Sequence, residues 1–270
     1  MRCPPTIGRR ARVKIAKFII YKLRKDGLVA LLVVAIKNVV NFKSRGAWWK
    51  VLQLPTLESR FSEIYEKNLW SSKESPSGLG SELVSTESLS GWLVEHIPSL
   101  GVKVFVDAPC GDFNWMQHVL KFVNVDYLGL DIVPSLIEKN NRFYSTGTIR
   151  FKVANICEDI IPSCDLVMVR DCLFHLSYDD INKFLDNLAG VEYKYLLTTT
   201  HIMNRGFVNS DIISGDFRQI DLFSSPFNFD KRKVADRIPD VPKGEKVTRE
   251  MILVQKRFVP NRLKLVTDKT

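Results

Sequence analysis

Between residues 102 and 200 the sequence alternates short apolar runs with helical patterns, and this alternation constrains the fold more than any other feature. The apolar runs are residues 102–107, 127–132, 149–156, 164–170 and 192–200. The helical patterns are residues 114–123, 134–144 and 179–188, with Pro134 in the first turn of the second. Apolar strands separated by helices are typical of a parallel sheet covered on both faces. We therefore expect a doubly wound α/β sheet that binds its ligands at the carboxyl ends of the strands.

Two further apolar runs, residues 217–223 and 249–256, follow without a strong helical pattern between them. They predict an antiparallel pair that completes a mostly parallel, seven-stranded sheet with a Rossmann-like topology. The expected organisation has four parts: a helical arm over residues 1–50, a polar loop and helix over 51–100, the core over 101–260 and a tail over 261–270.

The stretch that precedes the sheet, residues 56–90, is polar and rich in serine and glycine. Phe61, Ile64 and Tyr65 share one face of a short predicted helix. Residues 75–81, SPSGLGS, predict a loop. Ser85 and Thr86 are candidate caps for the helix that follows.

The positive charge of the chain is concentrated at its N-terminus. The net charge is +9, and residues 1–50 hold thirteen Lys/Arg against one acid, which leaves 26 Lys/Arg and 29 acids in residues 51–270. The arm therefore carries +12 and the rest −3. A nucleic-acid-binding domain usually carries its own basic face, so this distribution argues against nucleic acid as the ligand of the main domain.

The five cysteines, Cys3, Cys110, Cys157, Cys164 and Cys172, form no CxxC pair. Their odd number and irregular spacing argue against a disulfide framework or a zinc site, and favour reduced thiols in the cytoplasm.

The N-terminal arm combines a basic amphipathic pattern over residues 11–25 with a more apolar segment that begins at Gly27. The uncharged run from Gly27 to Ile36 is about half of the roughly 20 residues that cross a bilayer. Residues 11–42 are typical of a segment that lies on an anionic membrane surface. Two alternatives stay open: a helical hairpin packed on the main domain or a partner, and an RNA-docking element.

The turn after the first strand, VFVDAPCGDFNW (104–115), differs from a dinucleotide-binding loop. Such loops follow G-x-G-x-x-G, whereas this one has only Gly111. Pro109 offers no N–H, Asp112 repels phosphate, and Phe113 is too large for close helix–strand packing. The turn argues against a pyrophosphate ligand and suits a cofactor with an amino acid moiety.

Polar residues end four consecutive predicted strands. They are Asp107, Asp131, Asn155 and the pair Arg170–Asp171. Asp131 lies twenty residues beyond Gly111, where an acid can accept hydrogen bonds from ribose hydroxyls. Together with the glycine turn, this pattern predicts a nucleoside-cofactor site.

At this point the chain resembles the class I S-adenosylmethionine-dependent methyltransferases, through Asp107-Ala-Pro-Cys-Gly-Asp, Asp131 and the segment VMVRDCLFHLS. It is similar to a mostly microbial group within that class. The matching motifs are F-S-E-I-Y-E from Phe61, Trp70, Ser75–Ser81, Asp107–Trp115, Arg170–Ser177, Thr198–His201, Asn209–Ile212, Gly215, Arg218, Leu222 and Pro226–Phe227. The resemblance covers roughly residues 60–256 and leaves out the arm. Asn155 departs from the aspartate of many relatives, so we expect altered contacts to adenine.

The resemblance implies S-adenosyl-L-methionine as cofactor and methyl transfer as the reaction. It places the methionine end of the cofactor near Asp107, Ala108, Pro109 and Gly111, the ribose near Asp131 and Ile132, and adenine near Asn155 and Ile156; Arg170 completes the cofactor-binding set. The candidate catalytic residues are Asp171, His175 and His201. His175 is the first candidate for a general base, because imidazole titrates near neutrality, and His201 is its rival. Their spacing matches no recognised metal site, so no metal is expected.

The acceptor is not readable from the sequence. We expect O-methylation of a saccharide or another small or lipid-linked acceptor near a membrane surface, with the irregular segment 201–229 as a wall of the substrate site. Methylation of RNA or protein is an alternative, as is an inactive membrane-associated interaction module. The oligomeric state stays open.

Overall fold

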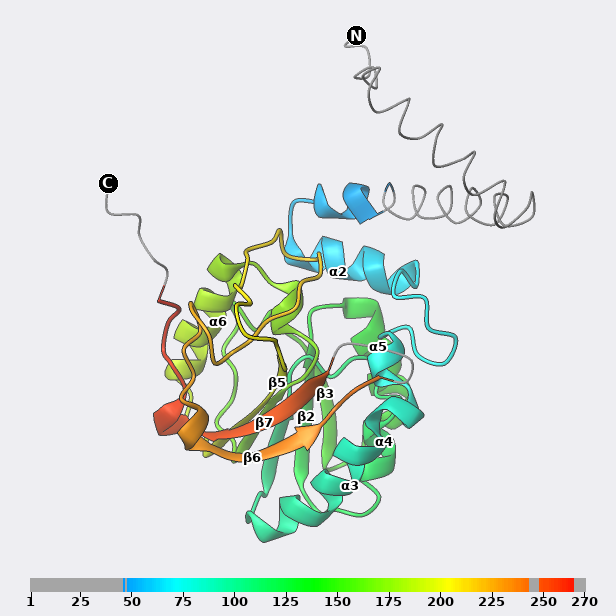
Figure 1. The fold of residues 1–270 in the computed structure, drawn as a ribbon. Helices are drawn as coiled ribbons and strands as arrows, with labels where there is room; N and C mark the ends of the chain where they lie inside the picture. The colour runs from blue at the N-terminus through cyan, green and yellow to red at the C-terminus, as the bar shows by residue number, and fades with distance from the viewer. Residues whose placement is uncertain (1–45, 47, 243–247, 265–270) are drawn as a thin grey trace, which may run out of the picture. The chain divides into compact units, whose positions relative to one another are not determined.

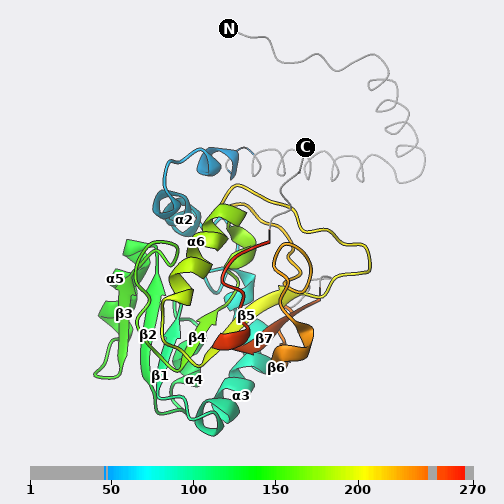
Figure 2. The same ribbon diagram turned by 90° about the vertical axis from the view of Figure 1, so that its left-hand side faces the viewer.

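The computed structural model describes residues 46, 48–242 and 248–264 and contains one seven-stranded sheet in the order β3-β2-β1-β4-β5-β7-β6 (Figures 1 and 2). The described residues from Val51 onward form one compact unit. The expected doubly wound, mostly parallel sheet is confirmed. The predicted arm, including the membrane-surface segment 11–42, lies outside the described residues except for 46 and 48–50.

Five parallel strands correspond to the five apolar runs between residues 102 and 200. They are β1 (Val104–Asp107), β2 (Asp126–Asp131), β3 (Ile149–Val153), β4 (Leu166–Val169) and β5 (Tyr195–His201). β1 lies between β2 and β4, with Asp107 beside Gly129 and Met168. The order reverses at β1, so the cleft beyond the carboxyl ends of β1, β2 and β4 is the expected ligand site.

The antiparallel pair at the edge of the sheet is β6 (Val234–Pro239) and β7 (Arg249–Gln255). The run 249–256 was predicted correctly, but the prediction of a strand over 217–223 is wrong. Ile220 and Leu222 are buried, yet they belong to an irregular segment that bonds to β5 through Ile220 O and the Leu222 N–H. These apolar side chains are buried although the segment forms no strand in the sheet. Their burial alone gave the sequence its apparent strand pattern.

The helices are α2 (Leu57–Glu66), α3 (Leu83–Ser99), α4 (Met116–Val119), α5 (Pro134–Tyr144) and α6 (Tyr178–Ala189). Short 3₁₀ turns cover η1 (Leu79–Ser81), η2 (Leu173–His175), η3 (Lys231–Lys233) and η4 (Lys256–Phe258). One helix is shorter than the sequence predicts. The helix expected over 114–123 is reduced to one turn, with Phe113 before it at φ +60°.

The start of α3 also differs from the prediction. Ser85 and Thr86 lie inside the helix rather than at its cap, and both are buried. The N–H of Leu83 instead donates to Glu74 Oε1 at 2.8 Å. This carboxylate lies nine residues away, so a search for local capping residues could not find it.

Two apolar clusters cover the two faces of the sheet. α6 contributes Ile181, Phe184 and Leu188 to one cluster, whereas α3 and α5 contribute to the other. Figure 1 shows α6 on one side of the sheet and α3, α4 and α5 on the opposite side. Within the described part of the chain, no helix is long and apolar enough to cross a membrane.

Candidate cofactor and acceptor site

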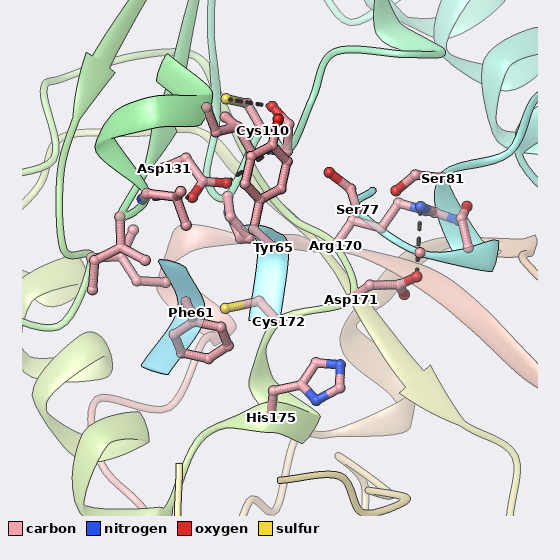
Figure 3. A pocket seen from close by; sticks show the side chains of 18 of the residues that line it. Phe61, Tyr65, Ser77, Ser81, Cys110, Asp131, Arg170, Asp171, Cys172 and His175 are labelled. Carbon is pink, nitrogen blue, oxygen red and sulfur yellow. Dashed lines mark hydrogen bonds and ion pairs between the residues drawn. The ribbon is translucent and has the colours of Figure 1, made fainter. Parts of the chain in front are cut away.

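A cavity of about 260 Å³ lies at the carboxyl ends of β1, β2, β3 and β4 (Figure 3). Ten of the twelve predicted site residues line it: Asp107, Pro109, Gly111, Asp131, Ile132, Asn155, Ile156, Arg170, Asp171 and His175. Ala108 and His201 are buried and are not among the lining residues. Figure 3 shows Asp131 and Cys110 at one side of the cavity and Asp171 and His175 at another.

The turn after β1 is held by backbone groups and by Asp131. The Cys110 N–H donates to Leu130 O at 2.8 Å, and the Gly111 N–H donates to Asp131 Oδ2 at 3.1 Å. Gly111 has φ +56°, a conformation that favours glycine. A Cβ at this position would meet Ser77 Oγ at 2.8 Å. The close approach expected of a cofactor is therefore made by Ser77 of the preceding loop.

We expect the Gly111→Ala substitution to lower the free energy of unfolding by about 1–3 kcal/mol, because alanine is strained at positive φ and its methyl group displaces Ser77. Gly147→Ala is the matched control, since a Cβ there meets nothing within 4 Å. Thermal and urea unfolding measure both variants. Equal stability of the two would contradict this role of Gly111.

Two carboxyl groups end adjacent strands in the cavity wall. Burial raises the pKa of Asp107 to about 8, although the Tyr127 hydroxyl donates to its Oδ2 at 2.8 Å. The buried Asp107 Oδ1 has no partner among the described residues. Burial also raises the pKa of Asp131, to about 6, opposed by the Val133 and Gly111 N–H groups that donate to it. Asp107 thus offers an unpaired acceptor, whereas both Asp131 oxygens already accept bonds.

The wall beyond β2 and β3 is mainly apolar and includes Ile132 after β2 and Ala154 and Ile156 after β3. Asn155 lines the same wall, and its Oδ1 accepts a 3.1 Å bond from the Cys157 N–H. This oxygen retains a second lone pair and the amide retains its N–H₂ donors. The wall can cover a flat, apolar ring and offer it a polar edge.

Arg170 is the centre of a buried ionic network. Its Nε and Nη2 donate to both oxygens of Asp240 at 3.0 and 2.8 Å, and Nη2 also donates to Gly80 O at 2.8 Å. Asp171 Oδ2 lies 3.6 Å from Arg170 Nη1 and 2.8 Å from Arg249 Nη2. The guanidinium groups of Arg170 and Arg249 thus balance the carboxylates of Asp171 and Asp240. The main role of Arg170 in this structure is to position these charged groups beside the cavity.

The ionisation of Asp171 follows from this network. Burial disfavours its charge, but Arg170 and Arg249 outweigh burial and hold its pKa below the usual value. Asp171 has φ +51°, and its N–H donates to Thr199 Oγ1 at 2.9 Å. A carboxylate is therefore fixed beside the cavity at neutral pH.

His175 faces the cavity, and only one of its two ring nitrogens is engaged in a hydrogen bond. Its Nδ1 lies 2.8 Å from the carbonyl oxygen of Asp216, so Nδ1 carries a proton and Nε2 keeps its lone pair. Burial lowers the pKa of His175, opposed by that hydrogen bond and by Asp171. The ring packs among Trp70, Phe174 and Phe217, with centroid distances of 5.7, 4.6 and 5.8 Å. A neutral imidazole with an available Nε2 can accept a proton.

His201 has a different environment. The Ile220 backbone N–H donates to His201 Nδ1 at 3.2 Å, and the His201 backbone N–H donates to Ile220 O. Burial lowers its pKa to about 4, helped by Arg249. It joins β5 to the irregular segment 217–223, outside the cavity lining.

The strand-end analysis did not assign roles to several lining residues. Phe61 and Tyr65 come from α2, Trp70 and Ser77 from the loop after it, and Phe217 and Arg249 from the C-terminal part. The first four occur in the motifs F-S-E-I-Y-E, W and S-P-S-G-L-G-S. These motifs contributed to the family resemblance, but they did not predict that the four residues line the same cavity as the strand ends. Nothing in the sequence indicated Arg249 or its partner Asp240. Among the described residues, no group of three or more His, Cys, Asp or Glu side chains is arranged to hold a metal ion.

No protein-family model matches the chain, and no curated protein matches its sequence. Solved structures with a similar fold include the 1,6-didemethyltoxoflavin-N1-methyltransferase of Burkholderia thailandensis, with 14% identity over 74% of this chain and 86% of that one and a TM-score of 0.54. The magnesium protoporphyrin IX methyltransferase of Synechocystis PCC 6803 has 12% identity over 75% and 98% and a TM-score of 0.54. Human N-acetylserotonin methyltransferase has 11% identity over 80% and 67% and a TM-score of 0.52.

All three neighbours were crystallised with S-adenosylmethionine or S-adenosylhomocysteine. At these identities the likeness establishes the fold. The chain therefore has the Rossmann-like fold of the class I S-adenosylmethionine-dependent methyltransferases, with the sheet order given above.

Proposed function

We propose that the protein is an S-adenosylmethionine-dependent methyltransferase that methylates a hydroxyl group of a small or lipid-linked acceptor, with a saccharide as the favoured class. The observation that carries this proposal is the unpaired, buried Oδ1 of Asp107, in a cavity that also contains Asp131 and His175. The fold and the narrower motif resemblance support the same conclusion.

The cavity fits the three chemical parts of this cofactor. The unpaired Asp107 oxygen suits the ammonium of the methionine moiety, because a buried carboxylate is stabilised by a cation. Asp131 ends β2 at the position that suits ribose hydroxyls. The apolar wall with Asn155 suits adenine. When bound, the cofactor supplies an electrophilic methyl group on a sulfonium.

The residues at the other side of the cavity suit an acceptor hydroxyl. His175 Nε2 can take the hydroxyl proton while its Nδ1 proton stays on the Asp216 carbonyl. The resulting imidazolium is stabilised by the negative charge of Asp171, which opposes the lowering of the His175 pKa by burial. We assign the base role to His175 rather than His201 because only His175 lines the cavity.

The choice of acceptor rests on the aromatic side chains around His175. Trp70 and Phe217 flank this ring, and Phe217 is 52% exposed although it lines the cavity. Aromatic faces pack well against the apolar faces of ring-shaped molecules. The three fold neighbours named above are methyltransferases of 1,6-didemethyltoxoflavin, N-acetylserotonin and magnesium protoporphyrin IX, which are small-molecule acceptors.

The membrane part of the proposal rests on the sequence of residues 11–42. Flotation with vesicles that contain phosphatidylglycerol should carry the full chain upward, because basic side chains bind anionic lipid. Neutral phosphatidylcholine vesicles are the control. No more flotation with these vesicles than with the neutral ones would contradict the binding of anionic membranes by the arm.

Titration calorimetry with S-adenosylhomocysteine tests the cofactor assignment. We expect one site per chain, and at least tenfold weaker binding in Asp107→Asn, because a charged hydrogen bond contributes about 1.5–3 kcal/mol. No heat at millimolar ligand would overturn the proposed activity. Unchanged affinity in the variant would overturn the role of Asp107.

Binding should also release a proton near pH 7. The Asp107 carboxyl is mostly protonated there because its pKa is raised to about 8, whereas an ammonium ligand requires the carboxylate. Affinity should therefore rise as the pH increases from 6 toward 8. Calorimetry at pH 7 in buffers with different ionisation enthalpies measures the proton, and Asp107→Asn should abolish its release. Equal release in both proteins would contradict this assignment.

A further inference from the structure

The turn Ile213–Asp216 lies against η2 and supplies the hydrogen-bond acceptor for the His175 ring. The Asp216 N–H closes the turn by donating to Ile213 O at 3.0 Å. The Gly215 N–H donates to His175 O at 2.8 Å, and the Asp216 carbonyl oxygen lies 2.8 Å from His175 Nδ1. The position of this turn therefore decides which group faces Nδ1 of the ring.

Ser214 anchors the turn through its carbonyl and its hydroxyl. The Ser214 carbonyl accepts a hydrogen bond from Arg60 Nη1 at 3.0 Å, and the Ser214 hydroxyl donates to Asp180 Oδ2. The same hydroxyl oxygen accepts from the Ser177 N–H at 2.7 Å. Because Ser214 is only 2% exposed, a lost partner is not simply replaced by bulk water. The turn is therefore fixed on both sides of one buried residue.

The two side chains that hold Ser214 come from different helices. Arg60 belongs to α2, whereas Asp180 belongs to the first turn of α6. Phe61, the residue after Arg60, lines the cavity together with His175 (Figure 3). Ser214 thus joins the turn to one helix that lines the cavity and to a second helix that packs on the sheet.

A neutral imidazole has two tautomers, and only one of them leaves the lone pair on Nε2. Burial lowers the pKa of His175, so the ring is neutral near pH 7. A carbonyl oxygen can only accept, so the Asp216 carbonyl keeps the ring proton on Nδ1. If the turn moves, Nδ1 loses this acceptor and the proton can shift to Nε2. The ring then has no lone pair on Nε2 for an acceptor hydroxyl.

We propose that Ser214, anchored by Arg60 and Asp180, is a positioning residue that selects the reactive tautomer of His175. This inference rests on the proposed function, in which His175 is the base. The tautomer itself can be measured without cofactor or acceptor, so the inference and the proposed function are tested separately.

Nitrogen-15 NMR of the histidine rings in the full chain is the first test, with the His175 signals assigned by their loss in His175→Asn. At neutral pH the unaltered chain should show a protonated Nδ1 and an unprotonated Nε2. In Ser214→Ala and in Asp180→Ala, both signals should move toward the intermediate shifts of a mixture of tautomers. Asp180→Asn keeps an oxygen that accepts from Ser214, so it should keep the unaltered spectrum.

The rate of labelled methyl transfer from S-adenosylmethionine to host extract is the second test. Ser214→Ala and Asp180→Ala should lower this rate about 10- to 100-fold, as misplacement of a reacting group does. Their affinity for S-adenosylhomocysteine should change little, which also shows that the variants are folded. Asp179→Ala is the matched control, because Asp179 is the exposed neighbour of Asp180 and also pairs with Lys183. It should match the unaltered chain in both tests.

The outcomes separate the two claims. An unchanged His175 tautomer in Ser214→Ala and Asp180→Ala, or a proton on Nε2 in the unaltered chain, would overturn the inference. An altered tautomer with an unaltered rate would overturn the base role of His175 and support the positioning of its ring by Ser214. An unaltered chain that transfers no methyl group would overturn the proposed function, and the spectra would still decide the inference.

Discussion

Replacement of His175 by Asn should lower kcat for methyl transfer by about 10²- to 10⁴-fold, the usual contribution of a general base. The side-chain amide of the introduced asparagine can keep the donor that Nδ1 gives to Asp216 O, so the local fold should persist. What the substitution removes is the Nε2 lone pair. Affinity for S-adenosylhomocysteine should change little, because the base acts on the acceptor.

The His175→Asn experiment uses transfer of a labelled methyl group to host extract, with calorimetry on the same preparations. His118→Asn, on α4 and away from the cavity, is the control and should retain full activity. A His175→Asn variant with unaltered kcat would remove His175 from the chemistry. It would leave Asp171 as the remaining charged candidate beside the acceptor.

Replacement of Asp240 by Ala should lower the free energy of unfolding by about 3–5 kcal/mol, because removal of one partner leaves buried charge uncompensated. The Asp240 side chain is fully buried and accepts two bonds from Arg170, and its backbone oxygen accepts from Arg249 Nε. Loss of this carboxylate also frees Arg170, which donates a hydrogen bond to Gly80 O in the cavity wall. Binding of S-adenosylhomocysteine should therefore weaken together with stability.

Urea unfolding measures the Asp240→Ala effect, and Arg232→Ala is the control. Arg232 pairs with Asp230 at the surface, with Arg232 86% exposed, so water replaces this partner and stability should hardly change. An Asp240→Ala protein as stable as the control would show that the Arg170 network does not support the fold.

The parallel half of the sheet could be predicted because each strand is a continuous apolar run between helical patterns. Edge strand β6 could not, since its exposure alternates and only Ile238 is buried. Its partners also come from β7, which follows later in the chain. The sequence pattern of 217–223 instead reflects burial of Ile220 and Leu222 in an irregular segment.

The site was predictable where it follows from sheet geometry alone. The ends of parallel strands meet at one edge, which placed Asp107, Asp131 and Asn155 together. The partner of Arg170 lies 70 residues further on, and the group that approaches Gly111 is Ser77, 34 residues before it. Such contacts depend on packing between distant segments, and no local residue pattern encodes them.

The central claim is that this cavity transfers a methyl group from S-adenosylmethionine to a hydroxyl acceptor. The most direct measurement incubates the full chain with methyl-labelled S-adenosylmethionine and fractionated host extract, and follows the label. The account predicts label in a saccharide or lipid-linked fraction with the unaltered chain, and a large loss of that label with His175→Asn. Label confined to RNA or protein would contradict the proposed acceptor, and no transfer to any fraction would contradict the methyltransferase assignment.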